Sequence, residues 1–365
     1  EGVEIQGGTV DVNCEPLSQV DFNVPYDLTA LPEKECVLII SFINKYSHPW
    51  CEAGYEQSFD QFVVKEAIAK KDKAQGEISF DKKRKAVCVK GEDFELQVVK
   101  GKITSLKYDG KEYLKEPIAP NYFRALTDND ISNFNFVPFL IPINPYFNWR
   151  WATNTAKGKI KSVTKNEKGQ IEINVNWSVK LFKGVTSEFV VNPDGSIEVT
   201  HTGTPKMFKL LRFGTKMGIL REFDMVKWYG RGPHETYFDR KTGGKITLHE
   251  KSVADLEHHY MRPQENANRT DVRFVEFRNK EGKGLRFEAM GETPICFSSW
   301  HYTQEELQKA KHIHQLPHKD ITTVNIDLNS IGVGGDMPGD AQVRDKYKLK
   351  PGKVYTYTFR IQPIK

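Results

Sequence analysis

Apolar positions in this chain recur mainly at every second residue. The clearest case is "QIEINVNWSVKL" (170–181), where apolar and polar residues alternate, as a half-buried antiparallel strand requires. The segment "VYTYTFRIQ" (354–362) repeats the alternation. The apolar face of the first segment comprises Ile171, Ile173, Val175, Trp177 and Val179.

Turn sequences separate these alternating segments. "YDGK" at Tyr108–Lys111, "NPDG" at Asn192–Gly195 and "NKEGKG" at Asn279–Gly284 each combine Asn or Asp with Gly, and such residues form tight hairpin turns. We therefore predict β-hairpins at these three places.

One segment predicts a helix. In "TQEELQKAKHIHQL", Thr303 and Glu306 have the spacing of a capping box, and Leu307, Ala310 and Ile313 follow at helical intervals. The chain shows no alternation of strands and helices, which excludes a (β/α) barrel within it. The predicted fold class is all-β.

The length of 365 residues favours two domains. We predict part of a small β-sandwich over residues 1–66, a connector over 67–75 and one large β-sandwich over 76–365. Lysine-rich "KEAIAKKDKAQGEISFDKKRK" (65–85) is interpreted as solvated connecting sequence, because acids interrupt the basic run and only one aromatic residue lies in it. Nucleic-acid binding is therefore not expected.

Composition excludes several other classes. No apolar run reaches the ~18 residues of a membrane-spanning helix, and the amino-terminal sequence has no signal-peptide pattern. The cysteines lack the CxxC spacing of a zinc site, so we predict buried thiols and no metal centre. They are Cys14, Cys36, Cys51, Cys88 and Cys296.

Three loops are unusually rich in charged and amide residues: "NYFRALTDNDIS" (121–132), "WYGRGPHETYFDR" (228–240) and "YMRPQENANRTDVR" (260–273). Each by itself is explained by a structural corner, but three on one scaffold indicate an organised site. No GxSxG, HExxH or GxxxxGK[ST] motif is present, and nothing selects a carboxylate pair for glycoside hydrolysis. We assign no catalytic residue.

These loops resemble motifs of the bacterial β-galactosidases of glycoside hydrolase family 2. "NYFRALTDNDIS" is similar to their "RAPTDND" segment, "WYGRGPHETYFDR" to "GxGPxExYxDR" and "YMRPQENANRTDVR" to "PQExGxRxxxR". "HYTQEELQKAKHIHQL" resembles their "YTxxxLxxAxHxxxL" helix, "VNIDLNSIGVGGD" their "xxxDxxxxGxGGD", and "PWCEAGYEQSFDQF" the end of their preceding sandwich domain. The motifs occur in the family's order along nearly the whole chain.

The resemblance implies the carboxy-terminal, non-barrel part of a retaining β-galactosidase, or its small subunit. The implied fold is the end of an immunoglobulin-like sandwich followed by a large sandwich like that of galactose mutarotase. The partner would be the (β/α)₈ barrel with the two catalytic glutamates, in the same chain or a separate one, and the substrate a terminal β-galactoside. The chain alone would be inactive. No cofactor is expected in it, and metal ions would belong to the barrel.

The resemblance also directs two loops toward the mouth of the barrel's active site. The first follows "TDND" and the second follows "GGD", so the expected mouth residues are Asp130, Asn133, Asp336, Met337 and Gly339. Many relatives carry a tryptophan shortly after the aspartate of "GGD", against which sugar can stack. Here Met337, Pro338 and Gly339 follow Asp336, and no tryptophan occurs after Trp300.

Other interpretations stay open at this point. The large sandwich could bind carbohydrate by itself, through Arg231, His234, Glu265 and Arg269, or His234 with Glu265 or Glu235 could serve as the acid and base of a mutarotase. The glycines of "SIGVGGDMPGDAQVRDKY" (330–347) are interpreted as a tight passage between strands, because the loop lacks the lysine and helix of a phosphate site. The resemblance points to a bacterial source; it distinguishes neither cytoplasm from periplasm nor a monomer from an oligomer.

Overall fold

The computed structural model describes residues 2–66, 76–132, 145–335 and 342–365. The chain forms two compact units, Glu1–Asp72 and Lys73–Lys365, and their division lies within the predicted connector. No helix of the described residues is long and apolar enough to cross a membrane.

The described residues of unit 1 form one antiparallel pair of strands, β1 (Cys36–Ile43) and β2 (Glu56–Lys65). Both strands leave large apolar side chains in water, with Phe42 49%, Ile43 57% and Phe62 48% exposed. Two strands form a sheet of marginal stability unless something packs on them. The immunoglobulin-like sandwich expected here therefore stays a prediction, of which the described residues show one hairpin.

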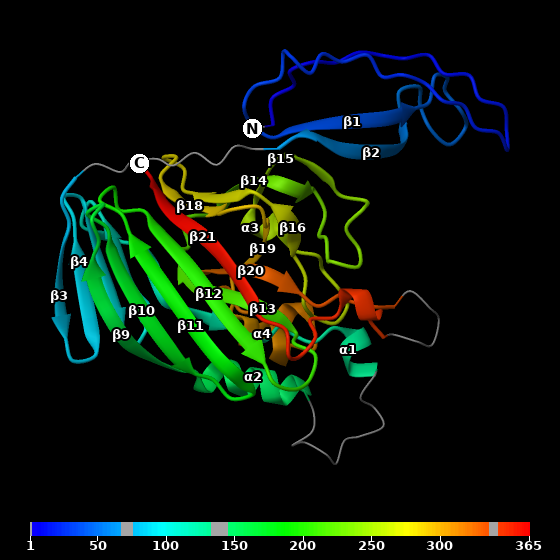
Figure 1. The fold of residues 1–365 in the computed structure, drawn as a ribbon. Helices are drawn as coiled ribbons and strands as arrows, with labels where there is room; N and C mark the ends of the chain where they lie inside the picture. Colours follow the sequence, from blue (N-terminus) through cyan, green and yellow to red (C-terminus); the bar gives the residue numbers. More distant parts are fainter. Residues whose placement is uncertain (1, 67–75, 133–144, 336–341) are drawn as a thin grey trace. The chain divides into compact units, whose positions relative to one another are not determined.

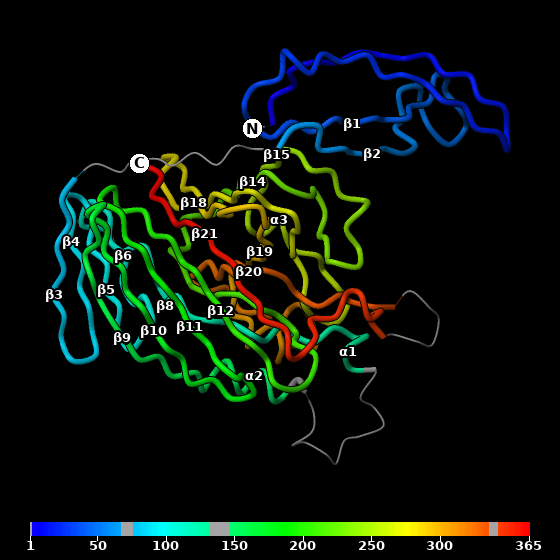
Figure 2. Tube along the Cα trace, viewed as in Figure 1, coloured from blue at the N-terminus to red at the C-terminus, as the bar shows by residue number. Residues whose placement is uncertain are grey.

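Unit 2 is built from two large antiparallel sheets (Figures 1 and 2). The first has nine strands, in the order β15 (Lys245–Ser252), β14 (Met225–Gly232), β17 (Phe274–Arg278), β18 (Gly284–Ala289), β21 (Tyr355–Ile364), β12 (Ile197–Pro205), β11 (Phe182–Val191), β10 (Ile171–Ser178) and β9 (Lys157–Lys165).

The second sheet has ten strands, in the order β16 (Arg269–Val272), β19 (Ile295–Trp300), β20 (Thr322–Ser330), β13 (Arg212–Ile219), β8 (Leu114–Asn121), β6 (Lys102–Tyr108), β5 (Phe94–Val99), β4 (Ala86–Lys90) and β3 (Ser79–Lys83), with β7 (Lys111–Glu112) beside β6. The predicted all-β class is thus confirmed, and so are the three predicted hairpin turns, which join β6 to β7, β11 to β12 and β17 to β18.

The period-two pattern matches the observed burial. Along β10 the residues Ile171, Ile173, Val175 and Trp177 are buried, and along β21 the alternation holds from Tyr355 to Ile361. One continuous apolar core runs between the sheets. Burial at ~25 cal/mol per Å² of apolar surface makes this core the main stabilising contribution of unit 2.

Helices are few and short: α1 (Asp128–Ser132), α2 (Pro145–Thr155), α3 (Val253–Leu256) and α4 (Gln304–Lys309), with 3₁₀ turns at η2 (Ile313–Gln315) and η3 (Asp345–Tyr347). The capping box of Thr303 and Glu306 is confirmed, but the helix ends at Lys309, before Ile313, because Ala310 turns to an extended conformation. The sequence pattern missed α1, α2 and α3.

Helix α2 is held by its one fully buried tryptophan. The Trp149 ring lies edge-on to Phe182, with 5.5 Å between centroids, and its Nε1–H donates to the Lys209 carbonyl at 2.9 Å. Helix α2 exposes the aromatic residues Phe147 and Trp151 as well as burying Trp149, so its sequence gives no clear amphipathic pattern, and the contact with a distant strand stabilises the helix.

Gly101 and Gly110 both have positive φ but differ in how closely neighbouring atoms approach them. A Cβ on Gly101 (φ 79°) would lie 2.5 Å from Val175 Cγ1 and 3.0 Å from Gly158 Cα, whereas one on Gly110 (φ 76°) would meet nothing within 4 Å. Both Gly→Ala changes carry the same left-handed backbone cost, but only Gly101→Ala also overpacks the core, by about 1–3 kcal/mol. We expect Gly101→Ala to lower the free energy of unfolding more than Gly110→Ala, measured by urea denaturation. Equal losses would contradict this packing.

Candidate functional site

Four motif loops meet at one junction in unit 2, and Arg124 lies at its centre. Its guanidinium is fully buried and donates to the carbonyls of Ile331 (2.6 Å) and Gly332 (3.1 Å). It also pairs with the carboxylate of Asp130 at 3.1 Å. Because a buried charge must find partners on several sides, Arg124 ties the start of α1 to the segment after β20.

Asp239 holds the glycine-rich segment from the opposite side. Its carboxylate accepts hydrogen bonds from the backbone N–H groups of Val333 (3.0 Å) and Gly334 (2.8 Å). A Cβ at Gly332 would collide with this carboxylate, which explains the requirement for glycine there. Asn129 adds a bond from its side-chain amide to the Val333 carbonyl at 3.0 Å.

The loop 260–273 is fastened to the same junction. Asp128 accepts from Arg262 (2.9 Å) and Gln264 (3.1 Å), while its own N–H donates to Gln264 Oε1 at 2.9 Å. The carboxylate of Glu235 accepts from the N–H of Ala267 at 3.0 Å. The motifs that are separate in sequence therefore form one hydrogen-bonded unit.

The junction fixes the points from which both expected mouth loops leave the scaffold. Asp130 is 5% exposed and its carboxylate is occupied by Arg124 and the Thr127 N–H (3.1 Å), so the structure gives it an internal partner. Asn133, Asp336, Met337 and Gly339 lie outside the described residues. Contact of these residues with a substrate stays a prediction.

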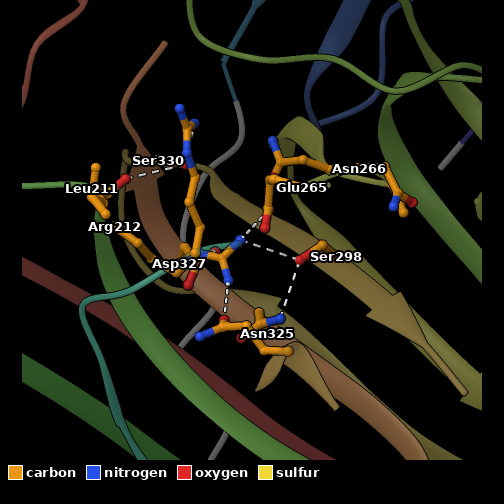
Figure 3. Close-up of polar contacts among 12 residues, drawn as sticks. Leu211, Arg212, Glu265, Asn266, Ser298, Asn325, Asp327 and Ser330 are labelled. Atoms are coloured by element: carbon orange, nitrogen blue, oxygen red, sulfur yellow. Dashed lines mark hydrogen bonds and ion pairs between the residues drawn. The ribbon is translucent and has the colours of Figure 1, made fainter. Parts of the chain in front are cut away.

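A second buried polar cluster lies beside the junction (Figure 3). Arg212, on β13, places Nη2 2.5 Å from Glu265 Oε1 and Nε 3.1 Å from Asp327 Oδ2, and all three side chains are fully buried. Asn325 and Ser298 are hydrogen-bonded to each other at 3.2 Å in the same cluster. One guanidinium thus faces two carboxylates in the interior.

Burial dominates the protonation of this cluster. It raises the pKa of Asp327 to about 7 and raises that of Glu265, although Arg212 lowers both. Within the described residues both Asp327 oxygens and Glu265 Oε2 lack a hydrogen-bond partner. The charge of Arg124 also lowers the pKa of Glu265, but burial outweighs both arginines. Two ionised carboxylates against one cation would leave a net buried negative charge, and a proton on Asp327 removes it.

The four suspected sugar-binding residues do not share a surface. Arg231 is bound by Asp271 (2.5 Å) and the Gly244 carbonyl (2.8 Å), and His234 is exposed on its loop. Glu265 pairs with Arg212 in the interior, and Arg269 donates to the Pro233 carbonyl at 2.9 Å. Glu265 and Arg269 are each 1% exposed, so this conformation offers them to no free sugar. Sugar binding by this set stays a prediction.

Sequence reasoning missed Arg212, Asp327, Asn325 and Ser298. The available signal was a charged or amide residue at an inward position of an otherwise apolar strand, such as Arg212 between Leu211 and Phe213. The described residues contain no group of three or more metal-ligating side chains.

The comparisons with known proteins agree with these motifs. A family model described as "Beta galactosidase small chain" matches residues 90–361. The chain belongs to the β-galactosidase small-chain family. A second model, "Beta-galactosidase, domain 4", matches residues 1–65.

Two individual relatives align with the whole of this chain. It is 32% identical over 372 residues to a β-galactosidase of Priestia megaterium and 29% identical over 379 residues to one of Halalkalibacterium halodurans, with 100% of the chain covered in both. It spans only 35% and 36% of those two relatives, about a third of their length.

Solved structures give a more distant likeness. A putative aldose 1-epimerase of Escherichia coli K12 is 10% identical, with 78% of this chain and 99% of that one covered, at a TM-score of 0.41. A galactose 1-epimerase of Lactobacillus acidophilus is 9% identical, with 79% and 99% covered, also at 0.41. Similarity of this degree does not extend to activity, and the assignment to the small-chain family rests on sequence.

The two hydrogen bonds that Asp239 accepts from the glycine-rich segment can be tested directly. Asp239→Asn replaces one acceptor oxygen by an NH₂ group, leaving a backbone N–H without a partner, at a cost of about 1–3 kcal/mol. We expect a lower free energy of unfolding and faster hydrogen exchange at the Val333 and Gly334 amides. Asp345→Asn, at an exposed carboxylate paired with Lys348, is the control and should stay close to wild type. Unchanged exchange at both amides would refute this anchoring.

The protonation of Asp327 predicts how stability depends on pH. The pKa of Asp327 is raised in the folded protein above the unfolded value of 3.8. The contribution of Asp327 to the free energy of unfolding is therefore fully present below pH 4, declines as the pH rises and is lost above about pH 7. Asp327→Asn removes this proton uptake. The free energy of unfolding of wild type minus that of the variant should fall from pH 5 to pH 7 and level off near pH 8. A difference independent of pH would show that Asp327 is ionised throughout.

Proposed function

We propose that this chain is the non-barrel part of a retaining β-galactosidase, which stabilises the assembly and completes the mouth of an active site whose catalytic carboxylates lie on another part. The observation that carries the proposal is the match of the small-chain family model over residues 90–361. The chain covers about a third of each β-galactosidase relative, which supports the proposal that the catalytic carboxylates lie on another part of the enzyme.

The geometry of the junction fits a supporting role. Arg124, Asp130 and Asp239 are engaged with backbone and side-chain groups of the chain itself. Charge-assisted hydrogen bonds of this kind hold loops rigidly, which suits segments that must meet a partner in one conformation. The substrate class, terminal β-galactosides, and the inactivity of the isolated chain belong to this proposal.

Unit 1 supports the need for a partner. Its two strands expose aromatic and aliphatic side chains that a stable domain buries, among them Ile39, Phe42, Ile43, Phe62 and Val63. A hairpin with this composition requires a covering surface in the working protein. The barrel-containing part of the enzyme, in the same or a separate chain, is the partner we propose to supply it.

Complementation tests the proposal. Mixing the chain with a barrel-containing β-galactosidase fragment should restore hydrolysis of an aryl β-galactoside, while each component alone stays near background. Ile39→Asp in unit 1 should weaken association because it places a charge on the face to be covered, and gel filtration would show the loss of complex. A complex that forms with intact barrel glutamates and still hydrolyses nothing would refute the proposal.

A further inference from the structure

A cationic strip runs along one end of the strands of unit 2. It combines the β3–β4 turn, the β5–β6 turn, the end of α2 with the start of β9, and the β10–β11 turn, all at the lower edge of the unit in Figure 1. Its nine cations are Lys83, Arg84, Lys85, Lys100, Lys102, Lys157, Lys159, Lys180 and Lys183.

Contacts between the segments show that the strip is continuous. The Lys100 N–H donates to the Lys85 carbonyl at 2.8 Å, and a Cβ on Gly158 would lie 3.1 Å from Gly101 Cα. Lys157 is opposite Ser178 in the β9–β10 register. The four segments that carry the cations therefore lie side by side although they come from distant parts of the sequence.

The strip contains no carboxylate of its own. Segments 83–85, 100–102, 147–159 and 179–183 carry no Asp or Glu, and within the described part of the chain none of the nine cations forms an ion pair. Glu305, which reaches this end from α4, is bound by Arg150 (2.8 Å) and Asn154 (3.1 Å). Some lysines elsewhere on unit 2 do have partners, such as Lys111 with Glu222 and Lys115 with Asp320.

Protection of sheet edges explains only part of this charge. Lysines on the edge strands β3 and β9 would discourage pairing with another sheet. Lys100, Lys102 and Lys183 belong to the inner strands β6 and β11 or the turn before β6, where no edge is free. Unpaired like charges repel one another, so protection of sheet edges does not explain the presence of the lysines on the inner strands.

Two exposed aromatic side chains adjoin the cations. Phe147 and Trp151 lie four residues apart on one face of α2 and are 54% and 46% exposed. The Lys180 ammonium lies 4.7 Å from the centre of the Trp151 ring. Large exposed aromatics beside charged groups are typical of interface anchors.

We propose that this strip docks an acidic protein segment that carries an aliphatic anchor, with carboxylates facing the lysines and the apolar side chain seated on Phe147 and Trp151. The partner's charge would match the unpaired cations and raise its association rate. The strip is separate from the loop junction, so the inference does not depend on the β-galactosidase role.

Binding of two labelled peptides to the full chain tests the proposal. One is a 16-residue oligoglutamate and the other has two central residues replaced by Leu-Leu; fluorescence anisotropy gives the Kd of each. We expect both to bind at low salt, more weakly as salt rises, with the Leu-Leu peptide tighter by about tenfold, since one apolar anchor supplies about 1.4 kcal/mol.

Matched variants locate the site. Lys100→Glu with Lys183→Glu should weaken both peptides at least tenfold, whereas Lys280→Glu with Lys283→Glu, the same charge change on the exposed β17–β18 turn, should alter Kd less than twofold. Phe147→Ala with Trp151→Ala should remove the advantage of the Leu-Leu peptide and leave oligoglutamate binding nearly unchanged. Thermal melts of each variant establish that it is folded.

Three results would overturn the proposal. Equal effects of the two lysine pairs would show binding to overall charge. Tighter binding of a single-stranded dT oligomer of equal charge than of the Leu-Leu peptide would identify a nucleic-acid surface. Concentration-dependent self-association that the Lys100→Glu, Lys183→Glu variant abolishes would make a second copy of this chain the occupant.

Discussion

The burial of guanidinium groups is the constraint on which the loop junction of this molecule depends. Arg124 and Arg212 are both fully buried, and a charge removed from water must be matched by acceptors close by. No single strand can supply them on all sides. The chain therefore brings carbonyls and carboxylates from several segments to each arginine, and the convergence of the loops follows from that requirement.

The positive charge of each buried arginine is balanced in a different way. Arg124 uses the carbonyls of Ile331 and Gly332 together with one carboxylate, Asp130, so its surroundings are close to neutral. Arg212 faces Glu265 and Asp327, and the excess negative charge is relieved by a proton, as the raised pKa of Asp327 indicates. The first arrangement positions loops; the second places a carboxyl group with a raised pKa in the interior of the sheets.

Two surfaces of the chain carry exposed groups that have no partner within the described residues. Unit 1 exposes the apolar side chains of a two-stranded sheet, and unit 2 carries a strip of unpaired lysines beside Trp151. The first is the face that we propose a barrel-containing part of the enzyme to cover. The second is a feature of the folded unit alone, created when four separated segments reach the same end of the strands.

The sequence by itself determined the two clearest strands, three hairpin turns and the all-β class, because alternation along one strand is a local property of the chain. It also identified Arg124, Asp128, Asn129, Asp130 and Asp239 as members of polar loops. Only the tertiary structure decided which of these residues meet: the bonds from Val333 and Gly334 to Asp239 join positions more than ninety residues apart. Helix α2, the buried trio of Arg212, Glu265 and Asp327, and the cationic strip escaped prediction for the same reason. Each depends on contacts between segments far apart in sequence, and no local pattern encodes the distance between two such segments in the fold.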